Sequence, residues 1–288
     1  MRLDREEYIE QAYFFRAFRE RLSENVSAQD ILTRLHEEIL SITRLPMAIQ
    51  FLATELKHAG LLGPAFGRLG HYFTPFQQFL IAQSEDERMR LTLPVALMVL
   101  EREARYRAET AIPAGLFVYQ LETISRNRLG YDEGIRAIAG DPDFNDDWKA
   151  YLDIVRRQIG TIDFADLVYL RSEYFVTERR RNEPDYEPPV PPLFAEKEGK
   201  IAKASRGRDP LFLFSALQRQ LGYPEVPRHK NKDDAEVRLA TMDLKMRELE
   251  NRIKLLEGEM HQSIDMTQFG KPEILDGKPV WDIDGKGK

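Results

Sequence analysis

The chain of 288 residues contains no cysteine, and it has only five histidines. The missing cysteine excludes disulfide bonds, thiolate zinc sites and cysteine nucleophiles. The sequence also lacks the His-Glu-x-x-His pattern of zinc proteases and the Gly-x-Ser-x-Gly pattern of serine hydrolases. A glycine-rich stretch, Gly60–Gly70, lacks the Gly-Lys-Ser/Thr ending of a phosphate-binding loop. We therefore interpret that stretch as a loop between helices.

Long apolar runs are missing as well. The longest run, Leu91–Leu100, is interrupted by Thr92 and Pro94. A membrane-spanning helix needs about 20 apolar residues, which is roughly twice this length. The first residues are charged and lack the apolar core of a secretory signal. We therefore expect a soluble, cytoplasmic protein that does not insert into a membrane.

The chain has no excess of positive charge, because its net charge is −6 at pH 7. Proteins that bind nucleic acid or anionic membranes through their whole surface are usually basic, so neither partner is expected here. The local exception is a basic segment, Lys197–Arg208, together with Arg179–Arg181. We take Arg206 and Arg208 as candidate partner contacts. Nucleic-acid contact through this segment stays an alternative.

Two patterns resemble metal-ligand sets but are incomplete. Glu55 and His58 form a Glu-x-x-His pair, whereas a di-iron helical bundle needs a second such pair, which the sequence lacks. Four aspartates lie within residues 141–147, without the spacing and closing glutamate of an EF-hand. We interpret them as caps of the following helix. We therefore assign no catalytic residue, no cofactor and no metal ligand.

The sequence has no long stretch of period-two alternation, so we predict an all-α fold. Helical spacing of apolar residues predicts a multi-helix body over residues 1–182. Asn145 is expected to cap one helix, and Asp163 another that continues to about residue 180. The four residues starting at Ser84 read as a capping box that opens a helix to about Thr110. Pro94 should kink or break that helix.

Prolines interrupt the helical pattern in residues 183–194, which we interpret as a semi-rigid, proline-rich linker. Residues 195–228 then combine the basic segment with one short helix, started by Asp209 and Pro210. This helix is apolar nearly all round. We therefore expect it to be covered, either by the N-terminal body or by a partner.

The most informative pattern is a heptad repeat in residues 229–264, a predicted coiled coil. Positive residues occupy the g positions and negative residues the following e positions, as in Arg252 and Glu257. In a parallel pair each g meets an e of opposite charge, whereas an antiparallel pair of identical chains places g against g. The pattern thus favours a parallel homo-dimer or homo-trimer over one helix folded back on its own body. The predicted oligomerisation seam contains Leu239, Met242, Met246, Leu249, Ile253, Leu256 and Met260.

Residues 265–288 read as an extended tail or a small hairpin, with Trp281 as a further candidate partner contact. The sequence contains heptads and no catalytic pattern. The leading hypothesis is therefore that the protein is a non-enzymatic scaffold or adaptor that self-associates. The alternative from another class is a helical enzyme or small-ligand protein with a site between helices of the body. The stretches Gly60–Gly70 and Leu91–Leu100 would border that site.

Overall fold

The computed structural model describes residues 2–86, 88–89, 91–109 and 111–228, together with residues 242, 245, 246, 249, 252 and 253. The chain divides into two units, residues 1–229 and 230–288, which we describe separately. The described part of the first unit contains thirteen helices and no strand, which confirms the all-α prediction. None of the helices among the described residues is long and apolar enough to cross a membrane.

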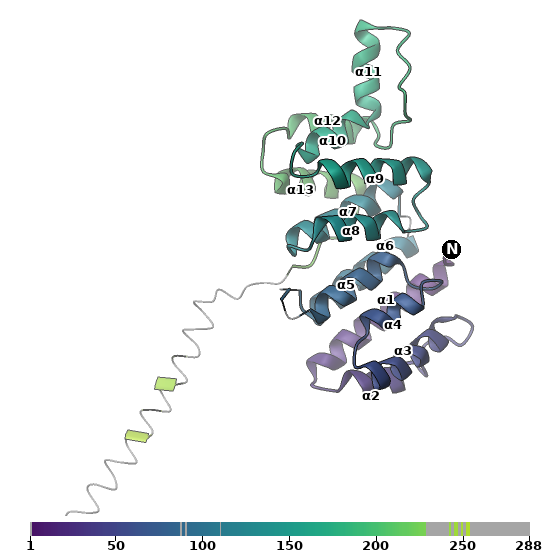
Figure 1. The fold of residues 1–288 in the computed structure, drawn as a ribbon, viewed down its shortest axis with the longest axis vertical. Helices are drawn as coiled ribbons and strands as arrows, with labels where there is room; N and C mark the ends of the chain where they lie inside the picture. Colours follow the sequence, from purple (N-terminus) through teal and green to yellow (C-terminus); the bar gives the residue numbers. More distant parts are fainter. Residues whose placement is uncertain are drawn as a thin grey trace, which may run out of the picture. The chain divides into compact units, whose positions relative to one another are not determined.

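The helices of the first unit are joined mainly by short connections (Figure 1). In chain order they are α1 Arg5–Ser23, α2 Ala28–Leu35, α3 Leu45–Ala59, α4 Gly63–Arg68, α5 Pro75–Glu85, α6 Leu93–Glu109, α7 Pro113–Arg126, α8 Tyr131–Ala139, α9 Asp146–Gln158, α10 Phe164–Leu170, α11 Glu173–Asn182, α12 Glu196–Ala204 and α13 Pro210–Leu221.

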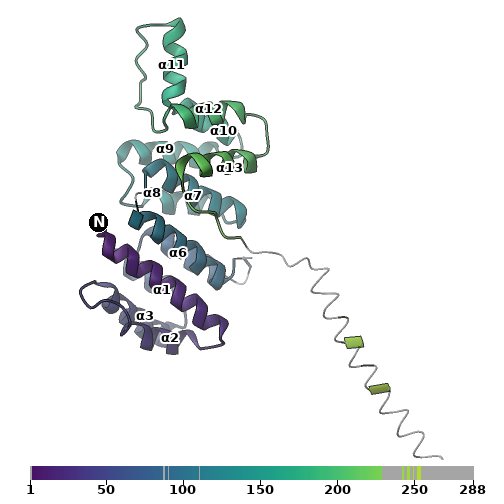
Figure 2. The ribbon, with the colours of Figure 1, turned by 180° about the vertical axis from the view of Figure 1, so that it is seen from behind.

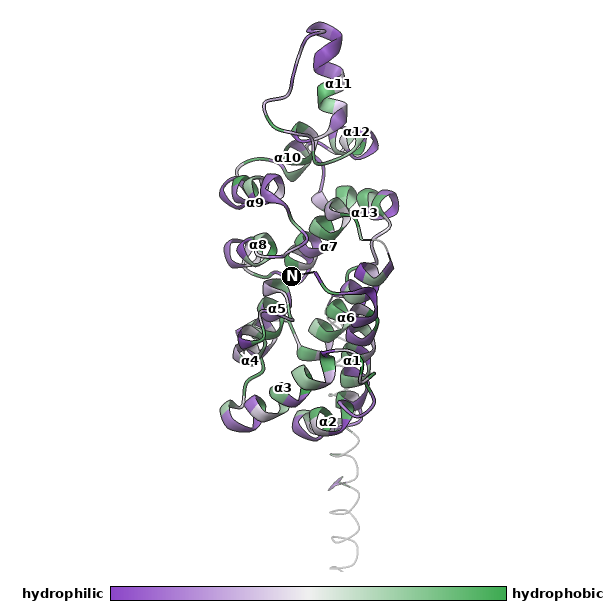
Figure 3. Cartoon of the chain, turned by 90° about the vertical axis from the view of Figure 1, so that its right-hand side faces the viewer, coloured by the Kyte–Doolittle hydropathy of each residue, from purple (hydrophilic) through white to green (hydrophobic). Residues whose placement is uncertain are grey.

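Most of these helices lie in two facing layers (Figures 1 and 2). Helices α3, α4, α5, α8 and α9 contact one another in that order in one layer, and α2, α1, α6, α7 and α13 follow one another in the other. Apolar residues face the space between the layers and polar residues face outward (Figure 3). Such two-layer packing buries the apolar stripe of each amphipathic helix against its neighbours.

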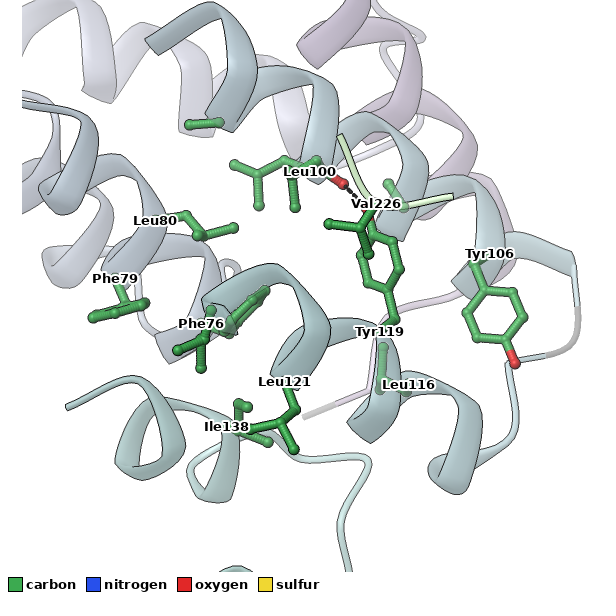
Figure 4. Packing of buried hydrophobic residues seen from close by; sticks show 14 of the residues in the cluster. Phe76, Phe79, Leu80, Leu100, Tyr106, Leu116, Tyr119, Leu121, Ile138 and Val226 are labelled. Atoms are coloured by element: carbon green, nitrogen blue, oxygen red, sulfur yellow. Dashed lines mark hydrogen bonds between the residues drawn. The ribbon is translucent and has the colours of Figure 1, made fainter. Parts of the chain in front are cut away.

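Helix α7 lies at the centre of the core. Every residue from Ala114 to Ile124 is buried, including Gln120 and Glu122. Figure 4 shows Tyr119 and Leu121 of α7 among apolar side chains from α5, α6 and α8 and beside Val226. The Tyr119 hydroxyl donates a hydrogen bond of 2.8 Å to the carbonyl of Val99. The interior thus satisfies a buried phenol with a backbone group of α6.

Predicted local signals position several helices. Asn145 caps α9 by accepting a bond from the Trp148 N–H at 3.0 Å, and Asp163 caps α10 by accepting one from Ala165 at 3.0 Å. Asp209 accepts a bond from the Leu211 N–H at 2.9 Å and so begins α13, as predicted. These predictions are confirmed because a cap depends on residues that are near one another in sequence.

The predicted helix from Ser84 to Thr110 is wrong at its start. Ser84 lies in the last turn of α5, and its hydroxyl donates to the carbonyl of Ile81 at 2.7 Å. Helix α6 begins only at Leu93, with Pro94 in its first turn. Proline is tolerated there because the first N–H groups of a helix have no intrahelical partner. Pro94 therefore starts a helix where we expected it to kink one.

Two further boundaries differ from prediction. The stretch Gly60–Gly70 is not simply a loop, because it contains α4, whose first turn includes Pro64. The predicted helix from residue 164 to about 180 is two helices, α10 and α11. They are separated at Ser172, whose hydroxyl accepts a bond from the Phe175 N–H at 3.3 Å and caps α11. A new cap inside a helical pattern ends one helix and opens another.

The proline-rich residues 183–194 connect α11 to α12 within the same compact unit. Their last residue, Phe194, is buried, and its ring centroid lies 5.4 Å from that of Trp148 and 5.9 Å from that of Tyr151. The Phe194 N–H donates to the carbonyl of Arg171 at 3.1 Å, and the Phe194 carbonyl accepts from the Glu173 N–H at 2.9 Å. This end of the linker is therefore fixed to the body.

Helix α13 is covered by the body, which was one of the two expected covers. It packs against α7, α10 and α12, and buries Leu213, Phe214 and Leu217. The Tyr223 hydroxyl, just after the helix, donates to Glu122 of α7 at 2.6 Å. Residues 195–228 therefore belong to the same core as the first helices, although Phe212 stays 67% exposed.

Candidate functional site

The described residues of the second unit belong to the predicted seam and its flanking g positions. All six are helical. The four apolar side chains are more than half exposed: Met242 by 63%, Met246 by 59%, Leu249 by 57% and Ile253 by 53%. These side chains expose apolar surface at heptad spacing. The predicted association itself stays a prediction.

The g-position cations Lys245 and Arg252 are helical and exposed. The acidic e-position residues predicted to face them, Glu250 and Glu257, lie outside the described residues. The other predicted contacts, Leu239, Leu256, Glu257, Met260 and Trp281, lie outside the described residues.

The basic segment lies on α12 and beside it, and Lys200, Lys203 and Arg206 of the segment pair with carboxylates of the same body. Lys203 contacts both oxygens of Glu178, at 2.6 and 2.8 Å. Arg206, a predicted partner contact, pairs with Asp166 at 2.5 Å and lies 4.1 Å above the ring centroid of Tyr169. These contacts reduce the positive charge offered to a partner. The second predicted contact, Arg208, is exposed and forms no ion pair within the described part of the chain.

The electrostatics of this segment follow from the same contacts. The hydrogen bond from Lys203, together with one from Tyr169, lowers the pKa of Glu178 to about 2. Burial and the same glutamate raise the pKa of Tyr169 to about 12. The segment is therefore a folded network of opposite charges and aromatic rings. The cations of this segment are visible in the sequence. That α10 and α11 place Asp166 and Glu178 beside them is not.

A buried charge cluster in the first unit was missed by the sequence analysis. Arg107 of α6 is surrounded by Glu103 one turn earlier and by Asp141 and Asp143 from the turn between α8 and α9. The side chains of Arg107, Glu103 and Asp141 are 1%, 0% and 0% exposed. We had interpreted the aspartates as helix caps. For Asp141 and Asp143 this is wrong, because both bind Arg107.

All five N–H groups of the Arg107 guanidinium are engaged by these carboxylates. Nε and Nη2 donate to Glu103 Oε1 at 3.3 and 2.8 Å, and Nη1 donates to Asp143 Oδ2 at 2.5 Å. Asp141 accepts from both Nη1 and Nη2. A hollow of about 280 Å³ adjoins this cluster and is lined in part by Arg2 and Tyr8. Because Arg107 has no free donor, it cannot bind an anion there without giving up a carboxylate.

Burial affects the protonation of this cluster. It raises the pKa of Glu103, against the opposing effect of the Arg107 charge. Burial also lowers the pKa of Arg107, but the charges of Asp141 and Glu103 outweigh it and hold that pKa well above its ordinary value. Glu103 Oε2 has no hydrogen-bond partner among the described residues. Arg107 therefore stays positively charged and joins α6 to the turn between α8 and α9. Glu103 is the acid of this cluster whose protonated, neutral form burial favours.

The expected borders of a ligand site are packed into the core. Leu62 and Phe66 of the Gly60–Gly70 stretch and Leu97 and Leu100 of α6 are each at most 1% exposed. A Cβ atom added at Gly63 would lie 3.0 Å from Ala82 of α5, so the two helices pack closely.

Glu55, one half of the incomplete Glu-x-x-His metal pattern, forms an ion pair. Glu55 pairs with Arg68 of α4 at 2.6 Å. Among the described residues no group of three or more acidic or histidine side chains is arranged to hold a metal ion. Glu55 thus acts as the acid of an ion pair between α3 and α4.

Comparison of the chain with protein-family models, with curated proteins and with solved structures finds no match in any of the three. The function must therefore be argued from the residues and their arrangement.

Proposed function

We propose that the protein is a non-enzymatic assembly protein, a scaffold or adaptor, that self-associates in parallel through its C-terminal heptads. The observation that supports this most directly is the exposure of Met242, Met246, Leu249 and Ile253, each above 50% on a helical backbone. Burying one such side chain fully contributes about 1.5–3 kcal/mol. A second helix of the same sequence would bury all four at once.

The charges beside the seam support the parallel arrangement. Lys245 and Arg252 at g positions are exposed, and the following e positions carry Glu250 and Glu257 in the sequence. In a parallel assembly, Arg252 of one chain would face Glu257 of another. An antiparallel pair would instead bring cations of the two chains together. The assembly would be a homo-dimer or a homo-trimer.

The chemistry of the body is consistent with a display role. Its most buried charges, those of Arg107, Glu103 and Asp141, are used to join helices to one another. Three cations of the basic segment, Lys200, Lys203 and Arg206, pair with carboxylates of the same body, which leaves less positive charge for the nucleic-acid alternative. The role of the body would therefore be to present its outer surface in two or three copies.

The direct test is the solution mass by light scattering after size exclusion, for the full chain and for a fragment ending at His229. We expect the full chain to have two or three times its monomer mass of 33.5 kDa, and the fragment to be a monomer. Monomers in both cases would refute the proposal. Equal oligomers in both would place self-association in the body.

Two double variants compare substitutions in the seam with substitutions on the outer face of the same helix by their effect on the oligomeric state. Leu249→Asp with Ile253→Asp places two carboxylates in the seam and should give a monomer. The control, Asn251→Asp with Lys254→Asp, places two carboxylates at the outer f and b positions of the heptad. It should keep the oligomer. Circular dichroism of both variants would show that the helical body is still folded.

A further inference from the structure

A second hollow lies on the body, far from the heptads in sequence. It is bordered by α7, the start of α8, the turn between α9 and α10, and the start of α13, and it has a volume of about 440 Å³. This volume lies within the range of about 300–1,000 Å³ that small-molecule sites occupy. The residues that line this hollow are spread over positions 121 to 214. The hollow is therefore formed by the tertiary fold and not by a local sequence motif.

The floor of this groove includes two aromatic rings. Phe164 and Phe214 line it with ring centroids 5.5 Å apart and planes inclined by 31°. Both rings and the neighbouring Leu121 are buried, being 7%, 3% and 1% exposed. Two tilted rings with an aliphatic side chain beside them favour a flat apolar group, because an aromatic ring can pack on them in an offset or edge-to-face arrangement.

The walls are held in place before any ligand binds. Asp163 accepts the Ala165 N–H at 3.0 Å with one oxygen and the Gly207 N–H at 2.9 Å with the other. It thereby joins the α9–α10 turn to the loop that precedes α13. The turn itself is fixed by Gly160, whose φ of +91° few other residues adopt. A preformed site loses less conformational entropy on binding than a mobile one.

The polar groups of the groove select for an uncharged ligand. Among the described residues that line it, the sole charged side chain is Asp163, and both its oxygens already accept backbone N–H groups. The hydroxyls of Ser125, Tyr131 and Thr161 also line the groove. None of the three hydroxyls donates to another residue in the described part of the chain. Each hydroxyl can therefore donate to, or accept from, a polar group of a ligand.

We propose that this groove binds an uncharged small molecule with a flat aromatic or alicyclic body and one hydrogen-bonding group. The body lies on Phe164 and Phe214, and the polar group meets the hydroxyls at the mouth. This site is independent of the proposed self-association, because no residue that forms it belongs to the heptads.

The probe for the test is N-phenyl-1-naphthylamine, which is uncharged, aromatic and carries one N–H. Titration of the full chain should give a saturable rise in fluorescence with one site per chain. Thr161→Trp places a large side chain in the exposed mouth and should lower the affinity at least tenfold. Arg157→Trp is the matched control, because Arg157 is exposed in the same region but does not line the groove. Its affinity should equal that of the natural sequence.

The absence of saturable binding would overturn the proposal, as would equal affinities of Thr161→Trp and Arg157→Trp. The double variant Ser125→Ala with Tyr131→Phe tests the polar end without changing the aromatic floor. It should weaken binding several-fold, because it removes two hydrogen-bonding hydroxyls. An unchanged affinity would overturn the assignment of these hydroxyls. Thermal unfolding of each variant confirms that the body is intact.

Discussion

The guanidinium of Arg107 and the carboxylate of Asp141 meet in the interior of the protein, although they are 34 residues apart. Both side chains are at most 1% exposed. Removing one partner of a buried pair leaves the other charge uncompensated, which typically destabilises a protein by about 3–5 kcal/mol. Because Glu103 and Asp143 still face Arg107, we expect Asp141→Asn to lower the free energy of unfolding by about 3 kcal/mol, the lower end of this range.

Urea unfolding of the full chain at a fixed concentration measures this effect. The control is Asp132→Asn, which disturbs the surface pairs that Asp132, 60% exposed, forms with Arg136 and Arg156, which are 67% and 30% exposed. Exposed pairs contribute about 0–1 kcal/mol, so this variant should change little. Equal effects of the two substitutions would show that the buried cluster does not stabilise the fold.

A second prediction concerns the pH dependence of stability through Glu103. Burial raises its pKa in the folded state above its ordinary value of 4.5. As the pH rises past 4.5, the unfolded chain releases this proton while the folded chain keeps it, so stability falls until the folded pKa is passed. Glu103→Gln removes the titration. The natural sequence should therefore lose stability relative to Glu103→Gln as the pH rises from about 4.5. Urea unfolding across a pH series measures both free energies of unfolding. The prediction is contradicted if the natural sequence becomes more stable relative to Glu103→Gln as the pH rises.

Glu178 should show the opposite sign. The bond from Lys203 lowers its folded pKa to about 2, so the unfolded chain binds the proton at a higher pH than the folded chain does. Its contribution is present above the ordinary pKa of 4.5 and is lost as the pH falls toward 2. The free energy of unfolding of the natural sequence, relative to that of Glu178→Gln, should thus increase as the pH rises from 2 to 4.5. The same unfolding series measures it, and a flat difference would refute the ion pair in solution.

The charge pattern of the heptads gives a third test, which concerns orientation. Arg252→Glu would place like charges opposite each other in a parallel assembly, because the new carboxylate would face Glu257 of the next chain. The variant should dissociate at a higher protein concentration than the natural sequence. Adding Glu257→Arg should restore the association. In an antiparallel assembly, Arg252→Glu alone would instead relieve repulsion and tighten it.

Gly160 provides a fourth test. Its φ of +91° is unfavourable for any residue with a Cβ atom, although an added Cβ would meet nothing within 4 Å. Gly160→Ala should therefore lower the free energy of unfolding by about 1–2 kcal/mol through the backbone alone. The control is Gly70→Ala, an exposed glycine whose φ is not positive and whose added Cβ would meet nothing closer than the Gly67 carbonyl at 3.5 Å. It should be neutral or slightly stabilising. Equal losses in urea unfolding would mean that the backbone conformation is not the cause.

The sequence predicted what depends on neighbouring residues. Asn145, Asp163 and Asp209 cap the helices assigned to them, because each acts within three positions of itself. Ser172 was missed because apolar residues at helical spacing continue on both sides of it, and a single capping serine in such a run gives little signal.

The contacts that define the sites were beyond such reasoning. The sequence predicts a cap at Asp141 because its partner, Arg107, lies 34 positions away in another helix. The groove beside Phe164 and Phe214 requires α7, α10 and α13 to be packed together, which no periodicity reports. In a single sequence, local propensity is visible, but the pairing of distant elements is not.

The placement of α13 and the residues after it has a consequence for synthesis. Asn127, at the end of α7, donates to the carbonyl of Pro227, which is translated 100 residues later. Val226 and Tyr223 also cover α7, the most buried helix. A nascent chain therefore cannot close its core until nearly the whole first unit has left the ribosome. The heptad stretch emerges directly afterwards, so under the proposed self-association the body would be completed just before the stretch that meets a second chain.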